Sequence, residues 1–365
     1  MVSAKDLMLS YLEGCEAAAY GVGMATEPRV RLNLNEFQYD LSPKVIETLR
    51  EQAPLAMQYV YMGDIPTIML QQKIADYAGV EREEIVLDEA LDQAFNRLPK
   101  LFIRPGDNIV SMAPTYPELI LGVERYGGKR KIVPAQPDLM MDADRILKAV
   151  DKRTKMIFVC NPNNPTSAKM ERDDVLKIVE NAHSSIVVVD ECYYEYCGET
   201  VADVINEYEN LYIARSFSKG FGLAGGRMAY LIACKENCRI FNKILNGFET
   251  NRFGVFGAMA SLDDLAYYRR VWKIINSEKT RMTREFTSLG LKVWDSATSF
   301  LFMDVSVTGR TSTEARDFFL QEYGILIRDV NATFPELDKR YVSFATGKRE
   351  INDLLIEGFR RLAGE

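Results

Sequence analysis

The feature that most constrains the fold is an alternation of short apolar runs with amphipathic runs between about residues 45 and 250. The apolar runs have the length and β-branched content of strands, and the runs between them, such as RDDVLKIVENAH (172–183), have the spacing of helices. Strands that alternate with helices favour a mostly parallel sheet covered on both faces. Seven runs are predicted as strands: EIVLD (84–88), NIVSMA (108–113), KRKIVPA (129–135), KMIFVC (155–160), SIVVVD (185–190), LYIARS (211–216) and RMAYLIA (227–233).

The C-terminal third has a different pattern. A long helical stretch near 255–288 is followed by TSFLFMDVSV, ILIRDV and YVSFA as strand-like runs, with TSTEARDFFLQEYG and EINDLLIEGFRRLAG as helices. We therefore expect an α/β protein with a large domain over 41–250 and a smaller α+β domain over 251–365. Residues 1–40 are expected to form an N-terminal segment that packs with the small domain.

Composition excludes several classes of function. The net charge is −7, and no cluster of basic residues with interleaved aromatics indicates a nucleic-acid partner. No apolar run approaches the ~20 residues that a membrane span needs. The six cysteines form no CxxC pair and lie apart from His183, the single histidine, so we expect no metal site and no Ser-His-Asp triad. Reduced thiols suit a cytoplasmic protein.

In parallel sheets, ligands bind at the carboxyl ends of the strands, and the stretch RSFSKGFGLAGGRMAY (215–230) follows one of them. It permits three interpretations. GFGLAG matches a dinucleotide loop, but that motif opens a helix, whereas a strand-like run follows here. SFSK matches the S-x-x-K of serine acyl-enzymes, whose S-D-N and K-T-G triplets the chain lacks. The third interpretation is a lysine, Lys219, that forms a Schiff base with an aldehyde cofactor.

Neighbouring strand ends favour the Schiff-base lysine. Such an amine must be partly neutral, and a phosphate-bearing cofactor would use the Ser216 and Ser218 hydroxyls and Arg227. A carboxylate is needed to pair with a pyridinium nitrogen, and SIVVVD ends at Asp190. The segments NPNNPT (161–166) and DECY (190–193) then place an amide and a phenol at the same edge of the sheet.

Together, NPNNPT, DECY and SFSKGFGLAGGR resemble the class I/II aminotransferases, which have fold type I of the enzymes that use pyridoxal 5′-phosphate. The chain is similar in style to the histidinol-phosphate aminotransferase branch, including its LNLNEFQYDLSPKVIETL, YVY (59–61) and PTY (114–116) segments. The resemblance covers nearly the whole chain. It implies a seven-stranded large domain, a homodimer, and transfer of an amino group between an amino donor and a 2-oxo acid acceptor.

The resemblance also implies roles for residues of the catalytic centre. Lys219 would bond to the cofactor and then move the proton between Cα of the substrate and C4′ of the cofactor. Asp190 would keep the pyridine nitrogen protonated. Tyr193 and Asn164 would hydrogen-bond the 3′-oxygen of the ring, and Asn164 would also contact the substrate.

Further residues are implied at the cofactor's ring and phosphate. Tyr116 would stack on the pyridine face. The phosphate would be bound by side chains and by amides at a helix N-terminus, contributed by Ser216, Ser218, Arg227 and the turn Ala90, Leu91 and Asp92. Tyr61 matches the tyrosine that reaches the phosphate of the neighbouring subunit, which implies that the active unit is a dimer.

The chain departs from the family where the substrate binds. The resemblance implies an arginine that clamps an acidic group of the substrate. An alignment without gaps puts Ser343 at that position, and a frame shifted by two puts Tyr341 there. Neither replaces a bidentate arginine contact. Another arginine would then hold the carboxylate; the candidates are Arg328, Arg340, Arg252 and Arg29. Alternatively, the enzyme runs a different reaction on the same cofactor, as a decarboxylase, lyase or oxidase. A dinucleotide-binding oxidoreductase is the alternative from another class.

Three smaller departures replace glycines or small residues of the family pattern. Leu91 stands in the phosphate turn, where only its amide is able to donate. Ser167 and Ala229 stand where the family has glycine. Replacement of glycine is tolerated where the backbone angle φ is negative.

Overall fold

The apolar runs between residues 84 and 233 form one seven-stranded sheet, as predicted. The computed structural model describes residues 7–13, 15 and 28–364. The strand order is β2-β8-β7-β6-β5-β3-β4. Only β8 runs antiparallel to its neighbours β2 and β7, and the other pairs are parallel. The bounds are β2 Ile85–Asp88, β3 Asn108–Ala113, β4 Lys129–Pro134, β5 Thr154–Cys160, β6 Ile186–Asp190, β7 Leu211–Ser216 and β8 Ala229–Ala233.

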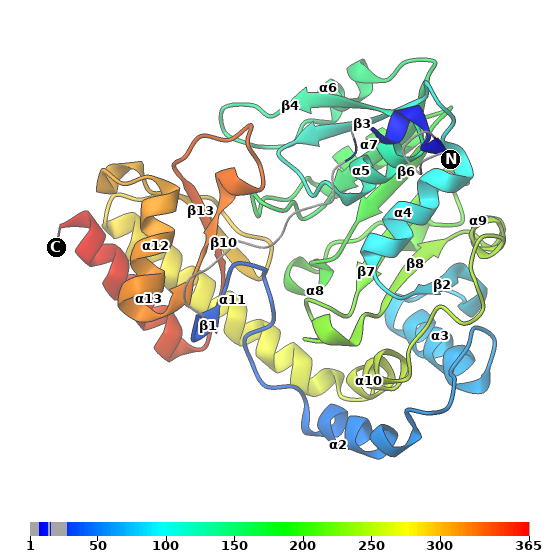
Figure 1. Cartoon of the computed structure of the whole chain (residues 1–365), viewed down its shortest axis with the longest axis horizontal. Helices are drawn as coiled ribbons and strands as arrows, with labels where there is room; N and C mark the ends of the chain where they lie inside the picture. The colour runs from blue at the N-terminus through cyan, green and yellow to red at the C-terminus, as the bar shows by residue number, and fades with distance from the viewer. Residues whose placement is uncertain (1–6, 14, 16–27, 365) are drawn as a thin grey trace.

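Helices cover both faces of this sheet (Figure 1). Alternate residues of a strand point to opposite faces, so Val187 and Val189 join one apolar cluster whereas Val188 joins the other. The first cluster includes residues of α2, α3, α6, α7 and α10, and the second includes residues of α4, α5 and α9. Their bounds, with the short α8, are α2 Pro43–Gln52, α3 Ile65–Ala78, α4 Leu91–Phe102, α5 Glu118–Arg125, α6 Ala143–Ala149, α7 Arg172–Asn181, α8 Tyr194–Cys197, α9 Lys235–Asn242 and α10 Arg252–Leu262.

The C-terminal third forms a smaller sheet of order β12-β13-β10-β9, with its own apolar core. Two expected elements are each divided in two: ILIRDV forms β11 and β12, and the stretch 255–288 forms α10 and α11, which are separated at Asp263 and Asp264. The elements are β9 Lys292–Val293, β10 Phe300–Asp304, β11 Ile325–Leu326, β12 Arg328–Asp329, β13 Tyr341–Ala345, α11 Leu265–Ser288, α12 Ser312–Tyr323 and α13 Arg349–Ala363. Short 3-10 turns are η1 Ser10–Leu12, η2 Ala53–Leu55, η3 Arg82–Glu84, η4 Ala202–Val204, η5 Ala224–Gly226, η6 Ser306–Thr308 and η7 Val330–Ala332.

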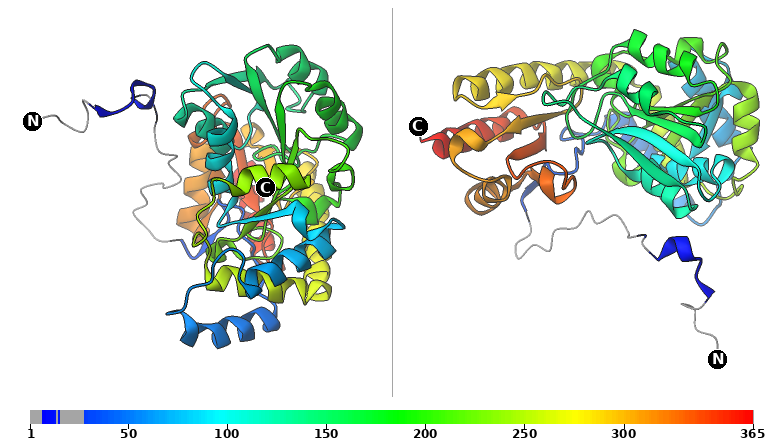
Figure 2. Two further views of the ribbon diagram at one scale, coloured as in Figure 1. Left: turned by 90° about the vertical axis from the view of Figure 1, so that its right-hand side faces the viewer. Right: turned by 90° about the horizontal axis from the view of Figure 1, so that it is seen from above.

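The two sheets lie side by side, and the long helix α11 extends from one to the other (Figure 2). Helix α10 packs against α2 and α3, on the side of the larger sheet. The division of the chain at residues 40 and 250 stays a prediction. No helix among the described residues combines the length and apolarity that a membrane crossing requires.

Residues 29–41, here called the bridging segment, connect the small sheet with the large one. Strand β1 (Val30–Arg31) pairs in parallel with β11, and the Leu32 carbonyl accepts a hydrogen bond from the Ala345 amide at 2.9 Å. Farther along, the Phe37 ring lies 6.2 Å from the Tyr268 ring. The remainder of the predicted N-terminal segment 1–40 lies largely outside the described residues, so its packing stays a prediction.

Candidate active site

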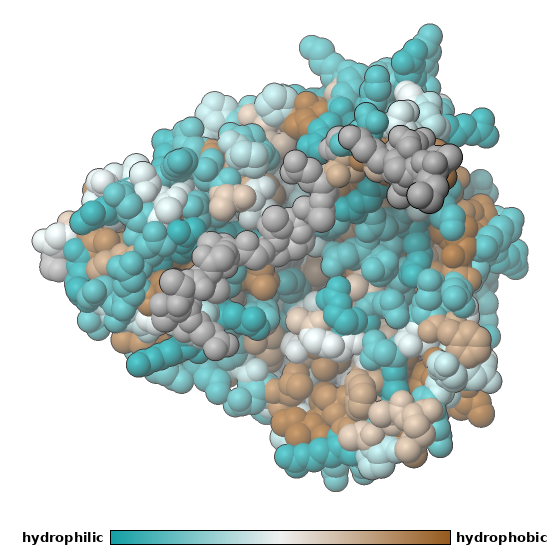
Figure 3. Space-filling model, viewed as in Figure 1, coloured by the Kyte–Doolittle hydropathy of each residue, from teal (hydrophilic) through white to brown (hydrophobic). Residues whose placement is uncertain are grey.

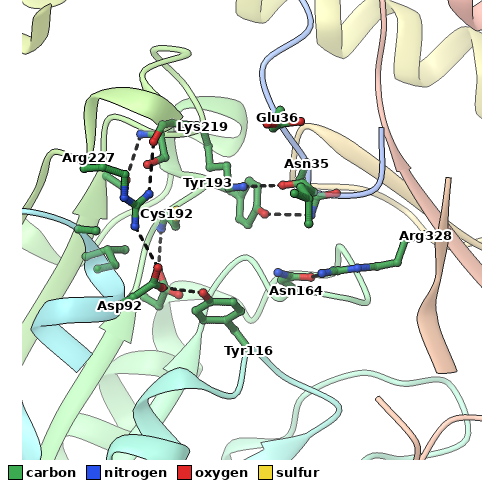
Figure 4. A pocket seen from close by; sticks show the side chains of 17 residues that line it. Asn35, Glu36, Asp92, Tyr116, Asn164, Cys192, Tyr193, Lys219, Arg227 and Arg328 are labelled. Carbon is green, nitrogen blue, oxygen red and sulfur yellow. Dashed lines mark hydrogen bonds and ion pairs between the residues drawn. The ribbon is translucent and has the colours of Figure 1, made fainter. Parts of the chain in front are cut away.

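A cavity of about 260 Å³ lies at the carboxyl ends of the strands of the large sheet, where the sequence predicts the site. It is bounded on one side by residues of the large sheet and helix α4 and on the other by β12 and the bridging segment (Figure 4). The structure brings together every predicted site residue except Tyr61. The lining residues are Leu34, Asn35, Glu36, Ala90, Leu91, Asp92, Tyr116, Asn164, Asp190, Cys192, Tyr193, Ser216, Ser218, Lys219, Ala224, Arg227 and Arg328.

Lys219 lies in the loop between β7 and β8, and its amine faces the bridging segment. Nζ donates a hydrogen bond to the Leu34 carbonyl oxygen at 2.8 Å. Burial lowers the pKa of Lys219, and the positive charge of Arg328 lowers it further. Both effects favour the neutral amine, which is the nucleophilic form. The GFGLAG run leads through η5 into strand β8 and opens no helix, which disfavours the dinucleotide interpretation.

Asp190 ends β6 as a buried carboxylate, 3% exposed. One oxygen accepts the Cys192 amide at 3.0 Å, and the other accepts the Cys160 thiol at 3.7 Å. Burial raises the pKa of Asp190 to about 7, because these neutral donors offset only part of the lost hydration. A cation placed against Asp190 would therefore stabilise its ionised form.

Tyr193 and Asn164 lie on the same side of the cavity, toward the small sheet. The Tyr193 hydroxyl accepts a hydrogen bond from Asn35 Nδ2 at 3.1 Å, and its ring packs edge-to-face on Phe300. Asn164 Oδ1 accepts a hydrogen bond from an Arg328 guanidinium nitrogen at 3.2 Å. Arg328 comes from β12 and is 8% exposed, so its charge lies in a region of restricted hydration.

The opposite end of the cavity has the features of an anion site. Helix α4 begins at Leu91, and Ala90 has no polar side chain to cap the first amides of the helix. Asp92 contacts two other residues at this end of the cavity. It accepts a hydrogen bond from the Tyr116 hydroxyl at 2.7 Å and forms an ion pair with Arg227 at 3.1 Å. Ser216 Oγ accepts the Ser218 amide at 3.0 Å. The helix dipole, the hydroxyls and Arg227 together favour a bound phosphate.

Tyr61 lies outside this cavity. Its side chain is half exposed, and its ring centroid is 5.8 Å from that of Phe248. Within one chain, therefore, the structure does not bring Tyr61 to the other site residues. Its predicted contact with a neighbouring subunit stays a prediction.

Ser343 lies on β13 in register with Arg328 on β12. It is fully buried, does not line the cavity, and its hydroxyl has no hydrogen-bond partner among the described residues. The other candidate arginines have different places: Arg340 pairs with Asp304 at 3.6 Å, and Arg252 donates to Gln52 at 2.8 Å. Of the four candidates, Arg328 alone is among the lining residues of the cavity.

Ser167 replaces a family glycine at a position where the backbone angle φ is positive. A residue other than glycine is tolerated without strain only where φ is negative. The φ of Ser167 is +60°, in the left-handed region, and its buried hydroxyl has no partner among the described residues. Ala229 lies within strand β8, where any residue is accommodated. The turn after NPNNPT thus keeps the shape that glycine favours, and the structure holds Ser167 in it at a conformational cost.

Five lining residues are not predicted from the sequence: Leu34, Asn35, Glu36, Cys192 and Ala224. The first three lie on the bridging segment, far from Lys219 along the chain. The LNLNEF run resembles a family segment. However, the only strand of the bridging segment is the two-residue β1, so neither a hydrophobic period nor a strand end marks these residues. The Leu34 contact uses a backbone carbonyl, which no side chain would reveal.

Comparison with known proteins gives concordant results. The family model "Aminotransferase class I and II" matches residues 27–358. A histidinol-phosphate aminotransferase of Thermoanaerobacter pseudethanolicus is 31% identical, over 92% of this chain and 93% of that protein. The histidinol-phosphate aminotransferase of Sinorhizobium meliloti, solved in complex with pyridoxal-5′-phosphate, superposes with a TM-score of 0.83 at 26% identity, over 92% of this chain and 91% of that one. The fold is also shared with an L-threonine-O-3-phosphate decarboxylase of Porphyromonas gingivalis (TM-score 0.77, 22% identity, 92% and 100% covered).

Proposed function

Since the chain belongs to the class I and II aminotransferase family, and is thus a pyridoxal 5′-phosphate-dependent transferase, we propose that it transfers an amino group from an amino acid to a 2-oxo acid with Arg328 binding the substrate carboxylate. The observation that carries this proposal is the position of Arg328. It lines the cavity at the end opposite Arg227, and Lys219 lies in the same cavity. A donor anchored by its carboxylate at Arg328 would therefore present its α-carbon between the two ends.

The residues of the cavity fit the cofactor. Asp190 is a buried carboxylate that accepts hydrogen bonds from two neutral groups, the Cys192 amide and the Cys160 thiol, and it would pair with the protonated ring nitrogen. The uncapped first turn of α4, the serine hydroxyls and Arg227 would hold the phosphate. When bound, pyridoxal phosphate supplies an aldehyde carbon that accepts amines and a ring that withdraws electrons from the substrate's α-carbon.

The chain's own residues would bind, orient and move protons. Lys219, with its lowered pKa, would act as the base that takes the proton from the substrate's α-carbon. The Leu34 carbonyl would hold the free amine inside the cavity through the hydrogen bond seen here. Asp92 would keep Tyr116 against one face of the ring and Arg227 at the phosphate, because it contacts both side chains.

We propose that the anionic group of the substrate is a carboxylate because Arg328 is the one guanidinium that the described residues place at this end of the cavity. The neighbouring position on β13 is Ser343, which adds no charge. One arginine matches the single charge of a carboxylate, whereas a phosphate with nearly two charges gains more from a second cation. The named substrate of the relatives, histidinol phosphate, is therefore expected to be a poorer donor for this chain than an amino acid.

Replacing Arg328 with glutamine tests this proposal. We expect kcat/KM for the best amino acid donor, with 2-oxoglutarate as acceptor, to fall roughly 10²-fold, the size of a lost charge-assisted contact. The corresponding amine without a carboxylate should change less than about threefold. Arg340→Gln, at a partly exposed arginine outside the cavity, is the matched control. An equal loss for the amino acid and the amine would show that Arg328 does not bind the carboxylate.

A second candidate function is a different reaction on the same cofactor: decarboxylation, elimination or oxidation. The observation that favours it is Ser343, which stands where the family pattern has an arginine on the acidic group of the substrate. Without that arginine, the orientation of the bonds at the α-carbon is less constrained. Release of carbon dioxide or ammonia without formation of a 2-oxo acid would identify this alternative.

We also propose that the chain works as a homodimer. Exposed apolar side chains at Tyr59, Tyr61 and Phe248 form a patch that supports this proposal, and the exposed Met57 and Ile65 are near neighbours along the chain. Brown and tan surface gathers in the lower part of Figure 3, where α2 lies. The Tyr59 and Tyr61 rings both pack on Phe248, with centroids 5.2 and 5.8 Å apart. A second copy that covers this patch would bury its apolar area and would bring Tyr61 toward the phosphate end of the other cavity.

Phe248→Asp is expected to convert this dimer to monomers, because it places a charge at the centre of the buried patch. Sedimentation at micromolar protein should show half the mass, and affinity for pyridoxal phosphate should fall roughly tenfold with the loss of the partner's tyrosine. Val307→Asp, at an exposed apolar residue elsewhere, is the control. A monomeric parent protein with full cofactor affinity would contradict the proposal.

A cytoplasmic location stays a proposal. It is supported by the six cysteines, which are all free thiols in this structure, as expected in a reducing compartment.

A further inference from the structure

We propose that Asn35 is a positioning residue of this active site: its side-chain amide fixes the Tyr193 hydroxyl as an acceptor, so that the tyrosine's own proton is directed to the cofactor's ring oxygen. This inference rests on the proposed function only in assigning Tyr193 to the cofactor. Asn35 and Tyr193 both line the cavity, and the bond from Asn35 Nδ2 to Tyr193 Oη is 3.1 Å long (Figure 4).

A phenol has one O–H donor and accepts hydrogen bonds through its lone pairs. Because Asn35 is the donor in the observed bond, the Tyr193 proton is not used in it. Both groups are almost fully buried, at 1% and 2% exposure, so bulk water does not compete for that proton. The proton is therefore available to an acceptor inside the cavity.

The local structure holds Asn35 in place at a cost. Its φ is +54°, in the left-handed region that asparagine tolerates better than most residues. Its Oδ1 is buried and has no hydrogen-bond partner among the described residues. A strained backbone and an unpaired buried oxygen persist where the surrounding structure imposes them, and such sites cluster where function requires the geometry.

The bridging segment imposes this backbone conformation on Asn35. On one side of Asn35, Leu32 is hydrogen-bonded to Leu326 and Ala345 of the small sheet. On the other side, the Tyr39 hydroxyl donates to the Gly347 carbonyl at 3.0 Å. Adjacent to Asn35, the Leu34 carbonyl accepts the Lys219 amine. The segment thus fixes Asn35 relative to the small sheet and to Lys219, and Asn35 transmits that placement to Tyr193.

The test reads the cofactor's visible absorbance against pH in the absence of any substrate, so it does not depend on which reaction the enzyme runs. A hydroxyl that donates to an anionic ring oxygen stabilises the deprotonated form of the bound cofactor and keeps the midpoint of the titration low. Asn35→Gly, which keeps the positive φ, is expected to raise this midpoint by about one pH unit. Asn33→Gly, on the same segment but outside the cavity, should leave it unchanged.

A double-mutant cycle separates positioning from a general effect on structure. If Asn35 acts through the hydroxyl, Asn35→Gly should shift the midpoint by less than about 0.2 unit in a Tyr193→Phe background. Asn35→Asp, which tolerates the same φ but accepts the phenol's proton, should raise the midpoint at least as much as Asn35→Gly and remains available if that variant does not fold. The proposal is overturned if both single variants titrate like the parent, or if the Asn35→Gly shift persists in full without the hydroxyl.

Discussion

Replacement of Lys219 with alanine is expected to abolish amino transfer, with kcat lowered by at least ~10⁴-fold, because the variant has lost both the amine that bonds to the cofactor and the base that moves the proton. The absorbance that depends on the bond between Lys219 and the cofactor should disappear as well. Turnover measured in coupled assays, and spectra of the purified protein with added pyridoxal phosphate, would report the two effects separately.

Two further variants make the Lys219 result specific. Lys219→Arg keeps a positive charge at this position but does not supply a neutral amine near pH 7, so it should be as inactive as Lys219→Ala. Lys235→Ala removes a surface lysine that pairs with Glu81 at 2.7 Å, and it should retain parental turnover. Parental rates in Lys219→Ala would remove the basis of the proposed chemistry.

Replacement of Asp190 with asparagine is expected to change activity and stability in opposite directions. Turnover should fall roughly 10³-fold or more, because the ring nitrogen loses the carboxylate that keeps it protonated. The cofactor-free protein should nevertheless melt several degrees higher at pH 8 than the parent. Burial raises the pKa of Asp190 to about 7, so above that pH the folded parent carries an uncompensated buried charge.

The sign of the pH dependence follows from the two states of Asp190. The pKa of Asp190 in the folded state lies above the unfolded value near 3.9, so the folded state binds the proton more tightly. The buried charge therefore destabilises the folded parent above pH 7, and this destabilisation is lost as the pH falls from about 7 to about 4. The melting difference between Asp190→Asn and the parent should therefore shrink over that range. Asp151→Asn should show the opposite sign, because hydrogen bonds from Lys131 and the Arg153 amide lower the pKa of Asp151. A difference for Asp190→Asn that does not vary with pH would contradict this account.

The sequence predicts the large sheet well, for a physical reason. Most strands of this sheet are buried and therefore apolar on both faces, so their runs of valine, isoleucine and leucine mark each of them to within one or two residues. Strand β4 is the exception, because it is largely exposed and begins with charged residues. The break between α10 and α11 is not predicted, because helical spacing continues across Asp263 and Asp264. Strand β1 of the bridging segment is not predicted either, since its two residues are too few to show a period.

For the candidate site, the sequence predicts the polar and charged residues that follow buried strands. An aspartate, an amide and a lysine at successive strand ends indicate a binding or catalytic site, because burial of such groups is costly. Asn35 and the Leu34 carbonyl lack that signal, because their roles depend on tertiary placement. Ser167 illustrates the same limit, since a serine residue does not reveal that its backbone has a φ of +60°.

Amino transfer itself is tested most directly by a half-reaction. The purified enzyme, loaded with pyridoxal phosphate and freed of excess cofactor, is mixed in turn with the common amino acids, simple amines and histidinol phosphate. Absorbance and released products are then measured together. We expect an amino acid to convert the bound cofactor to its aminated form, with one equivalent of the matching 2-oxo acid released per site. Loss of carbon dioxide or ammonia without aminated cofactor would contradict amino transfer, and would assign this cavity to another reaction of the same cofactor.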